Sequence, residues 1–249
     1  MTNTDFKVGV IKPVECFKEG FEMIKDQYWL FFGITLVGIL IAGLIPLALG
    51  MGAMYCGIYY CLLRKMDRQP FEFGDLFKGF NWFLPGLIAT LILIAPMIVF
   101  TLISIGSTFG ILFSMTNKQG DFNESAIVAL YGTMIVEGVI FGIIMGCIHA
   151  FIMFSYPLIV ERNLSGMDAF KLSAKAAWAN LSGVIGLILC QFALGFIGSL
   201  VCGIGMYFVM PISFAGIIVA YRKVFPPPTS NDFNNPPAPG AFSGAGNYN

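Results

Sequence analysis

The stretch RKMDRQPFEFGDLFK, residues Arg64–Lys78, decides how this chain is arranged, because it places alternating charges between two long apolar segments. A charged side chain at the centre of a bilayer costs about 2.5–3.5 kcal/mol even on lenient scales. The stretch therefore lies outside the hydrocarbon. The segments before and after it must enter and leave a membrane on its side.

Composition places the chain among integral membrane proteins. It is 57% hydrophobic and 11% charged, with a mean hydropathy of +0.80, whereas soluble domains are about 45–50% apolar and about 25% charged. So few charges could not cover a soluble domain. The net charge of zero argues against nucleic acid as a partner, and we expect the main surroundings to be membrane lipids.

The first 27 residues carry mixed charges and no secretory signal, so we expect residues 1–27 in the cytoplasm. Apolar side chains recur there at steps of three and four: Phe6, Val10, Val14, Phe17, Phe21, Ile24 and Tyr28. This spacing predicts an amphipathic helix. The helix either lies in the inner headgroup plane or docks on other parts of the protein.

The uncharged run Tyr28–Leu63 is too long for one membrane span. At 1.5 Å per residue it would make a helix of about 54 Å, against a hydrocarbon core of about 30 Å. Pro46 and the glycines Gly50 and Gly52 lie near its middle, so we predict two short spans, 28–46 and 48–64, joined by a tight turn. A single crossing or a re-entrant loop is the alternative.

The rest of the chain repeats this pattern. Asp75 is placed to cap an interfacial turn before the apolar run 83–115, the hydrophilic loop 117–124 follows, and the run 126–160 returns. The last pair, 181–221, divides at 198–205. We predict an all-α, polytopic transmembrane helix bundle over residues 28–224, with about six spans as three hairpins and cytoplasmic interfacial amphipathic helices.

The distribution of positive charge predicts the orientation of this bundle. Of the fourteen Lys and Arg residues, all but Lys118 fall on one face. The positive-inside bias makes that face cytoplasmic, with both termini inside. The tail, residues 225–249, is rich in Pro, Gly and Asn and is predicted to be disordered and cytoplasmic.

An internal repeat is visible in this arrangement. Trp29, Trp82 and Trp178 each stand where the chain is predicted to enter the membrane, and cations close each hairpin. The unit is an interfacial helix followed by a hairpin. It indicates either a true threefold duplication or convergence, because any hairpin needs an aromatic residue at one end and cations at the other.

The strongest local motif is a stripe of small residues, Gly138, Gly142, Gly146 and Ala150, which predicts close packing against another helix. His149 lies about 20° from Gly138 on a helical wheel and about 17 Å from the charged end, near mid-membrane. It is either a proton-relay or metal residue, or a neutral imidazole hydrogen-bonded across a helix interface. The absence of an acid on its face favours the second interpretation.

Little else in the sequence indicates chemistry. The six cysteines, Cys16, Cys56, Cys61, Cys147, Cys190 and Cys202, form no C-x-x-C pair, and there is no Walker loop, G-x-S-x-G or H-E-x-x-H motif. We expect no catalytic residues, no cofactor and no metal site, and therefore no enzymatic activity.

Three segments carry a resemblance to a known family: RKMDRQPFEFGDLFKGF at 64–80, PLIVERNLSGMDAFKLS at 157–173 and AYRKVF at 220–225. With the first hairpin, they resemble uncharacterised bacterial polytopic membrane proteins of the DUF975 type, related to the membrane domain of glycerophosphodiester phosphodiesterases. The resemblance implies the multi-pass architecture and a bacterial inner (cell) membrane. It implies no catalytic residue.

Two functions are compatible with these features. The first is a non-enzymatic inner-membrane scaffold, assembly factor or accessory subunit, with a membrane-protein partner or a homo-oligomer as its assembly. The alternative is a small-solute or lipid transporter built from Pro-broken, Gly-rich spans. A transporter would need a polar cavity near a set of intramembrane polar residues: Thr101, Ser104, Thr133, His149 and Gln191.

Overall fold

The computed structural model describes residues 6–45, 49–116, 124–200 and 203–227, and every regular element among them is a helix. The α-helices are α1 (Pro13–Ile24), α2 (Tyr28–Leu44), α3 (Met51–Met66), α4 (Phe83–Thr116), α5 (Glu124–Ile152), α6 (Ser155–Arg162), α7 (Gly166–Ala179), α8 (Leu181–Ser199) and α9 (Gly205–Val224). Two 3-10 helices accompany them, η1 (Lys25–Gln27) and η3 (Phe73–Trp82). The predicted all-α class is confirmed.

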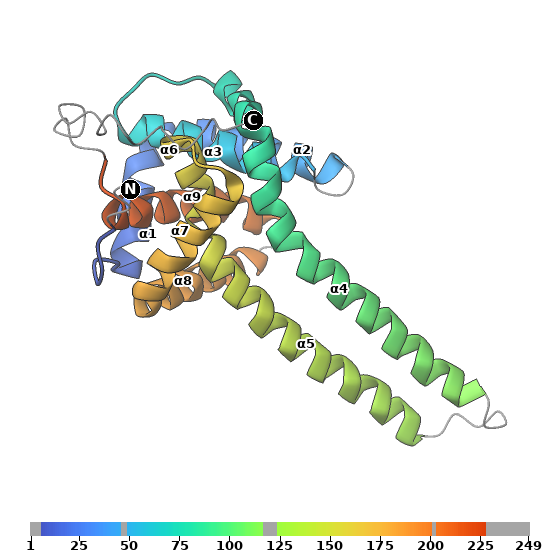
Figure 1. Cartoon of the computed structure of the whole chain (residues 1–249). Helices are drawn as coiled ribbons and strands as arrows, with labels where there is room; N and C mark the ends of the chain where they lie inside the picture. Colours follow the sequence, from blue (N-terminus) through green and yellow to red (C-terminus); the bar gives the residue numbers. More distant parts are fainter. Residues whose placement is uncertain (1–5, 46–48, 117–123, 201–202, 228–249) are drawn as a thin grey trace, which may run out of the picture.

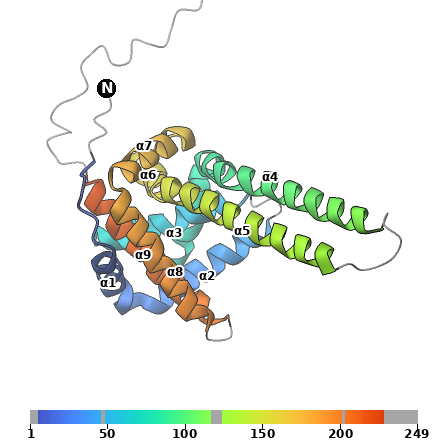
Figure 2. The same ribbon diagram turned by 90° about the horizontal axis from the view of Figure 1, so that it is seen from below.

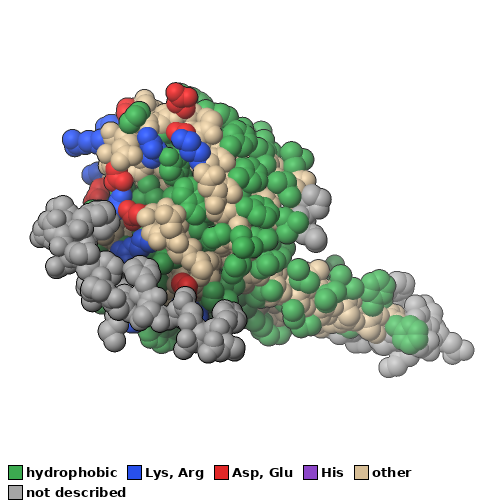
Figure 3. All heavy atoms as spheres, turned by 45° about the horizontal axis from the view of Figure 1, so that its top comes forward, with side chains coloured by type: hydrophobic (Ala, Val, Ile, Leu, Met, Phe, Trp, Pro, Cys, Tyr) green, Lys and Arg blue, Asp and Glu red, His purple; other side chains and the backbone are tan. Residues whose placement is uncertain are grey.

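Two parts can be distinguished in the molecule. The shorter helices and the inner ends of α4 and α5 form a body, and the rest of α4 and α5 projects from it as a long antiparallel hairpin (Figures 1 and 2). On the face shown in Figure 3, charged side chains gather at the end of the body away from the tip of the hairpin, and hydrophobic side chains cover much of the rest. This separation of charge from apolar surface is typical of a multi-pass membrane protein.

Five of the described helical segments are long and apolar enough to cross a membrane. They are Pro13–Leu44, Phe73–Phe113, Leu130–Arg162, Leu181–Ser199 and Gly205–Val224. The second predicted span, 48–64, is not among them, because α3 has only 16 residues and measures about 24 Å at 1.5 Å per residue. Helix α3 instead lies in the core, with most of its side chains buried, including Met54, Ile58 and Leu62.

The chain nevertheless reverses between α2 and α3. The Lys65 ammonium at the end of α3 lies 2.5 Å from the Asp26 carboxylate in η1. The beginning of α2 and the end of α3 are therefore neighbours, which excludes a single crossing through Tyr28–Leu63. Pro46, which was expected in the turn, lies outside the described residues.

The two apolar runs that form the long hairpin differ in whether their helix is continuous. Helix α4 is continuous over 34 residues with Pro96 inside it. The returning run is divided, because α5 ends at Ile152 and α6 begins at Ser155. The hydrophilic loop 117–124 lies, except for Glu124, outside the described residues.

Asp75 does not occupy the predicted position at the start of the interfacial turn. The N-cap of η3 is Glu72, and Asp75 is the third residue of a capping box, where its carboxylate accepts a hydrogen bond from the Glu72 backbone N–H at 3.0 Å. The expectation of Asp75 as the N-cap was wrong by three residues. The same two side chains still satisfy the free backbone donors of the turn.

Helix α1 docks on the protein through part of its predicted apolar face, because Phe17 and Ile24 are buried whereas Val14 and Phe21 are exposed. Its buried residues are Cys16, Phe17, Gly20 and Ile24. A Cβ atom added to Gly20 would lie 2.7 Å from the Ala215 backbone, and one added to Gly216 would lie 2.5 Å from the Phe17 ring. Helix α1 therefore packs closely against α9. Of the two predicted arrangements, in the headgroup plane or docked on the protein, the structure has the docked one.

The beginning of the predicted disordered tail is ordered. Phe225 is fully buried, and its ring contacts Phe6, Phe154 and Tyr221. Residues 228–249, which hold the remainder of that prediction, lie outside the described residues.

Candidate functional site

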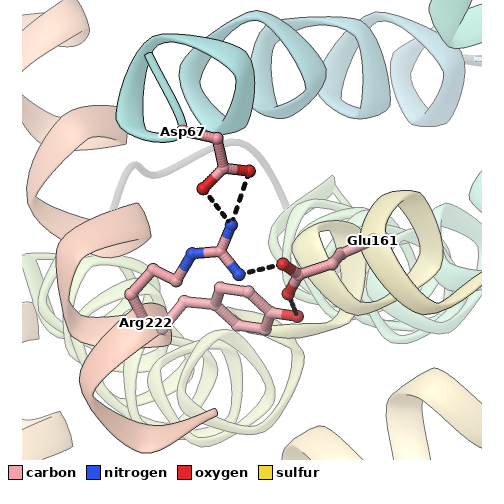
Figure 4. A network of polar contacts seen from close by, with 4 residues as sticks. Asp67, Glu161 and Arg222 are labelled. Carbon is pink, nitrogen blue, oxygen red and sulfur yellow. Dashed lines mark hydrogen bonds and ion pairs between the residues drawn. The ribbon is translucent and has the colours of Figure 1, made fainter. Parts of the chain in front are cut away.

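A charged network joins the ends of three helices (Figure 4). Arg222, near the end of α9, donates through Nη2 to both carboxylate oxygens of Asp67, at 2.7 and 2.8 Å. Its Nη1 donates to Glu161 of α6, and the Tyr221 hydroxyl donates to the same carboxylate. We call these four residues the charged clamp.

The charged clamp collects residues from all three predicted hairpin ends. Asp67 caps α3 just after the Arg64-Lys65 pair, Glu161 lies beside Arg162, and Arg222 precedes Lys223. The Arg222 and Glu161 side chains are only 12% and 14% exposed. Because every charged group of the clamp has a partner of opposite charge, the arrangement is suited to holding the three helix ends together.

A cavity of about 170 Å³ lies inside the body, between α3, α5, α6, α8 and α9, with α4 on one side. We call it the tyrosine cavity. Its lining residues are Met51, Tyr55, Tyr59, Leu93, His149, Ile152, Met153, Tyr156, Gln191, Ser213, Phe214 and Ile217. No Asp, Glu, Lys or Arg is among these residues.

His149 and Gln191 meet at the wall of this cavity. The His149 Nε2 atom lies 3.1 Å from the Gln191 Oε1 atom, and this hydrogen bond connects α5 to α8. The partner is the amide carbonyl of a neutral side chain, and no carboxylate lines the cavity. Among the lining residues, the structure thus gives His149 one hydrogen-bond partner, and that partner is a neutral amide.

The tyrosines supply the other polar groups of the cavity. The Tyr156 hydroxyl lies 3.2 Å from the Thr90 hydroxyl, which donates to the Gly86 carbonyl. The hydroxyls of Tyr55 and Tyr59 donate no hydrogen bond to any residue that the structure describes, yet neither is sealed from the cavity. Their rings are held in place by edge contacts with Phe214.

The other polar residues named for a transporter do not reach this cavity. The Thr101 hydroxyl donates to the Met97 carbonyl of its own helix at 2.8 Å. Ser104 accepts a hydrogen bond from Ser107 at its backbone carbonyl. Neither of them, nor Thr133, is among the lining residues. Of the five polar residues, the fold brings together only His149 and Gln191.

The predicted small-residue stripe faces open space over most of its length. Cβ atoms added to Gly138, Gly142 and Gly146 would meet nothing within 4 Å, whereas Ala150 is buried. The inner part of the stripe lines an open apolar groove of about 580 Å³ between α5 and α8. The lining residues of this α5–α8 groove are Gly142, Ile143, Gly146, Cys147, Ala150, Phe151, Trp178, Leu181, Ile185, Ile188 and Leu189.

A second open pair of glycines lies on α4 and was missed from the sequence. Gly106 and Gly110 are four residues apart in the outer half of this helix, and Cβ atoms added to them would also meet nothing within 4 Å. The G-x-x-x-G spacing could have revealed the pair. Glu137 is half-buried on α5.

The described part of the chain offers few other candidates for a catalytic or metal-binding site. No group of three or more His, Cys, Asp or Glu residues is placed to hold a metal ion there. Cys16, Cys56 and Cys61 are free and buried, while Cys147 is free and exposed.

Comparisons with known protein families, with curated proteins and with solved structures found no match. The DUF975-type resemblance therefore stays a prediction.

Proposed function

We propose that this chain is a non-enzymatic integral membrane protein that acts as a scaffold or accessory subunit, and that the outer half of the α4–α5 hairpin binds a membrane-protein partner. The supporting observation is the length of an apolar hairpin whose side chains are largely exposed among the residues that the structure describes. Helices α4 and α5 have 34 and 29 residues, or about 51 and 44 Å, against a hydrocarbon core of about 30 Å.

The surface of the hairpin is apolar along its length. Strongly exposed side chains extend toward its tip: Leu102, Phe109, Phe113, Val128, Tyr131 and Ile135. Lipid around a strongly tilted hairpin would cover part of this surface, but tilts beyond about 40° are unusual. A partner helix would cover the remainder, and the open glycines Gly106, Gly110 and Gly138 allow its backbone to approach closely.

Photo-crosslinking tests this proposal. A benzoylphenylalanine placed at Phe109, beside the open glycines of α4, or at Ile135, beside Gly138, should capture the same membrane protein in native membranes. Changing Gly106 and Gly110 together to leucine should abolish the capture without lowering the yield of folded chain, because both positions face open space. The level of the captured protein should fall in cells that lack this chain.

Leu44, at the end of α2, provides the matched control position, because it is apolar and 80% exposed but lies off the hairpin. Crosslinks to lipid alone at both hairpin positions would contradict the proposal. So would a product that contains only two copies of this chain, because that product indicates self-assembly without a separate partner. Equal capture from Leu44 would show that the reaction is not specific to the hairpin.

We further propose the six-span topology, with α3 as a short span covered by its neighbours and both termini cytoplasmic. The pairing of Lys65 with Asp26 and of Arg222 with Asp67 supports a common side for these ends. A membrane-impermeant thiol reagent applied to intact cells should label a cysteine at Gly120 and spare one at Gln69, with the parent chain giving the background. Labelling at Gln69 would overturn every side assignment.

A transporter of small solutes or lipids is the second candidate, favoured by the tyrosine cavity beside His149 and Gln191. Alternating access needs a site that opens to both sides in turn. Flux of a bound ligand across proteoliposomes would favour this candidate over the scaffold.

A further inference from the structure

We propose that the tyrosine cavity binds the uncharged, hydroxyl- or ester-bearing headgroup of a lipid, whose acyl chain lies in the α5–α8 groove. This inference is independent of the scaffold proposal, because it uses the inner ends of α5 and α8 and not the outer half of the hairpin. It is based on the polarity of the cavity, its size and its position next to the groove.

The polarity of the cavity favours an uncharged ligand. The hydroxyls of Tyr55 and Tyr59 have no acceptor among the described residues, and the Ser213 hydroxyl donates to none of them either. These hydroxyls open onto the cavity, so they are placed to donate to a ligand that offers acceptor oxygens. A charged headgroup would find no Lys, Arg, Asp or Glu among the lining residues to offset its loss of water.

The size of the cavity limits the headgroup. The cavity measures about 170 Å³, which suffices for a small headgroup such as one of glycerol size. The rest of the lining is apolar, from Met51, Leu93 and Ile217 among others, so the ligand must carry hydrocarbon next to its polar end.

The groove beside the cavity supplies a place for that hydrocarbon. Neighbouring residues of α5 line both spaces. His149 and Ile152 line the cavity, while Ala150 and Phe151, which lie between them in the sequence, line the groove. On α8, Leu189 lines the groove and Gln191 the cavity. The two spaces thus lie on adjacent faces of the same two helices, which the hydrogen bond between His149 and Gln191 connects at the cavity wall.

Binding of labelled 1,2-dioleoylglycerol to the purified full chain in detergent tests this inference. We expect saturable binding that unlabelled dioleoylglycerol displaces and that glycerol, phosphatidylglycerol and phosphatidylcholine do not. Tyr55→Phe and Tyr59→Phe each remove one hydroxyl and keep the ring that packs on Phe214. Each should weaken binding about fivefold, as expected for one lost hydrogen bond.

Tyr60→Phe is the matched control, because the Tyr60 hydroxyl accepts a hydrogen bond from Arg64 and does not line the cavity. It should bind as the parent does. Gly146→Phe, at an open position of the groove, should reduce binding by obstructing the acyl chain. All four variants should keep the crosslink from Phe109, which separates this inference from the scaffold proposal.

Several results would overturn the inference. Unchanged affinity in both the Tyr55 and Tyr59 variants would remove the cavity as the headgroup site. Displacement by phosphatidylglycerol or phosphatidylcholine as effective as by dioleoylglycerol would exclude an uncharged specificity. Displacement by glycerol at equal concentration, or full binding by the Gly146 variant, would show that no acyl chain occupies the groove.

Discussion

Replacing Gly79 by alanine should unfold a large fraction of the protein. A Cβ atom at this position would lie 2.0 Å from the Ala53 carbonyl oxygen and 2.6 Å from the Gly57 backbone nitrogen. The contact is reciprocal, because a Cβ atom on Gly57 would lie 2.0 Å from the Leu76 carbonyl oxygen. The two backbones touch, so no flexible side chain can move aside.

The cost of this substitution follows from what must move. Overpacking a core typically costs about 1–3 kcal/mol and sometimes more. Here η3 would have to separate from α3, which would also loosen the packing of the fully buried Leu76. We therefore expect a loss of about 3 kcal/mol or more. Unfolding of the detergent-solubilised chain, followed by the loss of its monodisperse chromatographic peak on heating, measures the effect.

Gly74 provides the control on the same element, because a Cβ atom added there would meet nothing within 4 Å. Gly74→Ala should change the free energy of unfolding by no more than about 0.5 kcal/mol. If the Gly79 and Gly74 variants melted alike, the close approach of η3 to α3 would not exist in the membrane protein.

These glycine contacts show where sequence-based prediction stops. The reversal of the chain before Arg64 could be predicted, because burying a charge is costly wherever it occurs and the position of charges along the chain is visible. The contact of Gly57 with Gly79 could not be predicted. A small residue indicates that another segment can approach the backbone closely, but it does not indicate which segment does so. The regular stripe on α5 attracted attention, yet its glycines from Gly138 to Gly146 face open space, whereas isolated glycines elsewhere hold the body together.

The tyrosine cavity was predictable in part for a similar reason. His149 is the single histidine in an apolar segment, so it stands out in the sequence, and Gln191 is a rare polar residue in its span. Tyr55 and Tyr59 do not stand out, because aromatic residues are common in membrane helices. Their convergence on the cavity depends on the crossing of α3 with α9, which no local pattern specifies. The pairing of Asp67 with Arg222 could not be predicted from the sequence either, because the two residues are 155 positions apart.

Replacing Arg222 by methionine should be the most damaging change among the charged residues. It would leave the Glu161 carboxylate, which is only 14% exposed, with the Tyr221 hydroxyl and no positive charge in the clamp. Removing one partner of a largely buried ion pair typically costs about 3–5 kcal/mol. Asp67 would lose its bidentate contact as well, but at 43% exposure it can be hydrated. We expect a loss of about 3 kcal/mol in the same unfolding assay.

A second substitution shows whether the unpaired charge causes this loss. Adding Glu161→Gln to the Arg222→Met variant removes the uncompensated carboxylate while preserving an acceptor for the Tyr221 hydroxyl, so most of the lost stability should return. Lys12→Met is the control, because the Lys12–Glu15 pair is 71% and 54% exposed and such pairs contribute less than about 1 kcal/mol. A double variant no more stable than Arg222→Met would attribute the loss to the packing of the arginine stem, and the charged clamp would then hold the three helix ends by shape and not by charge.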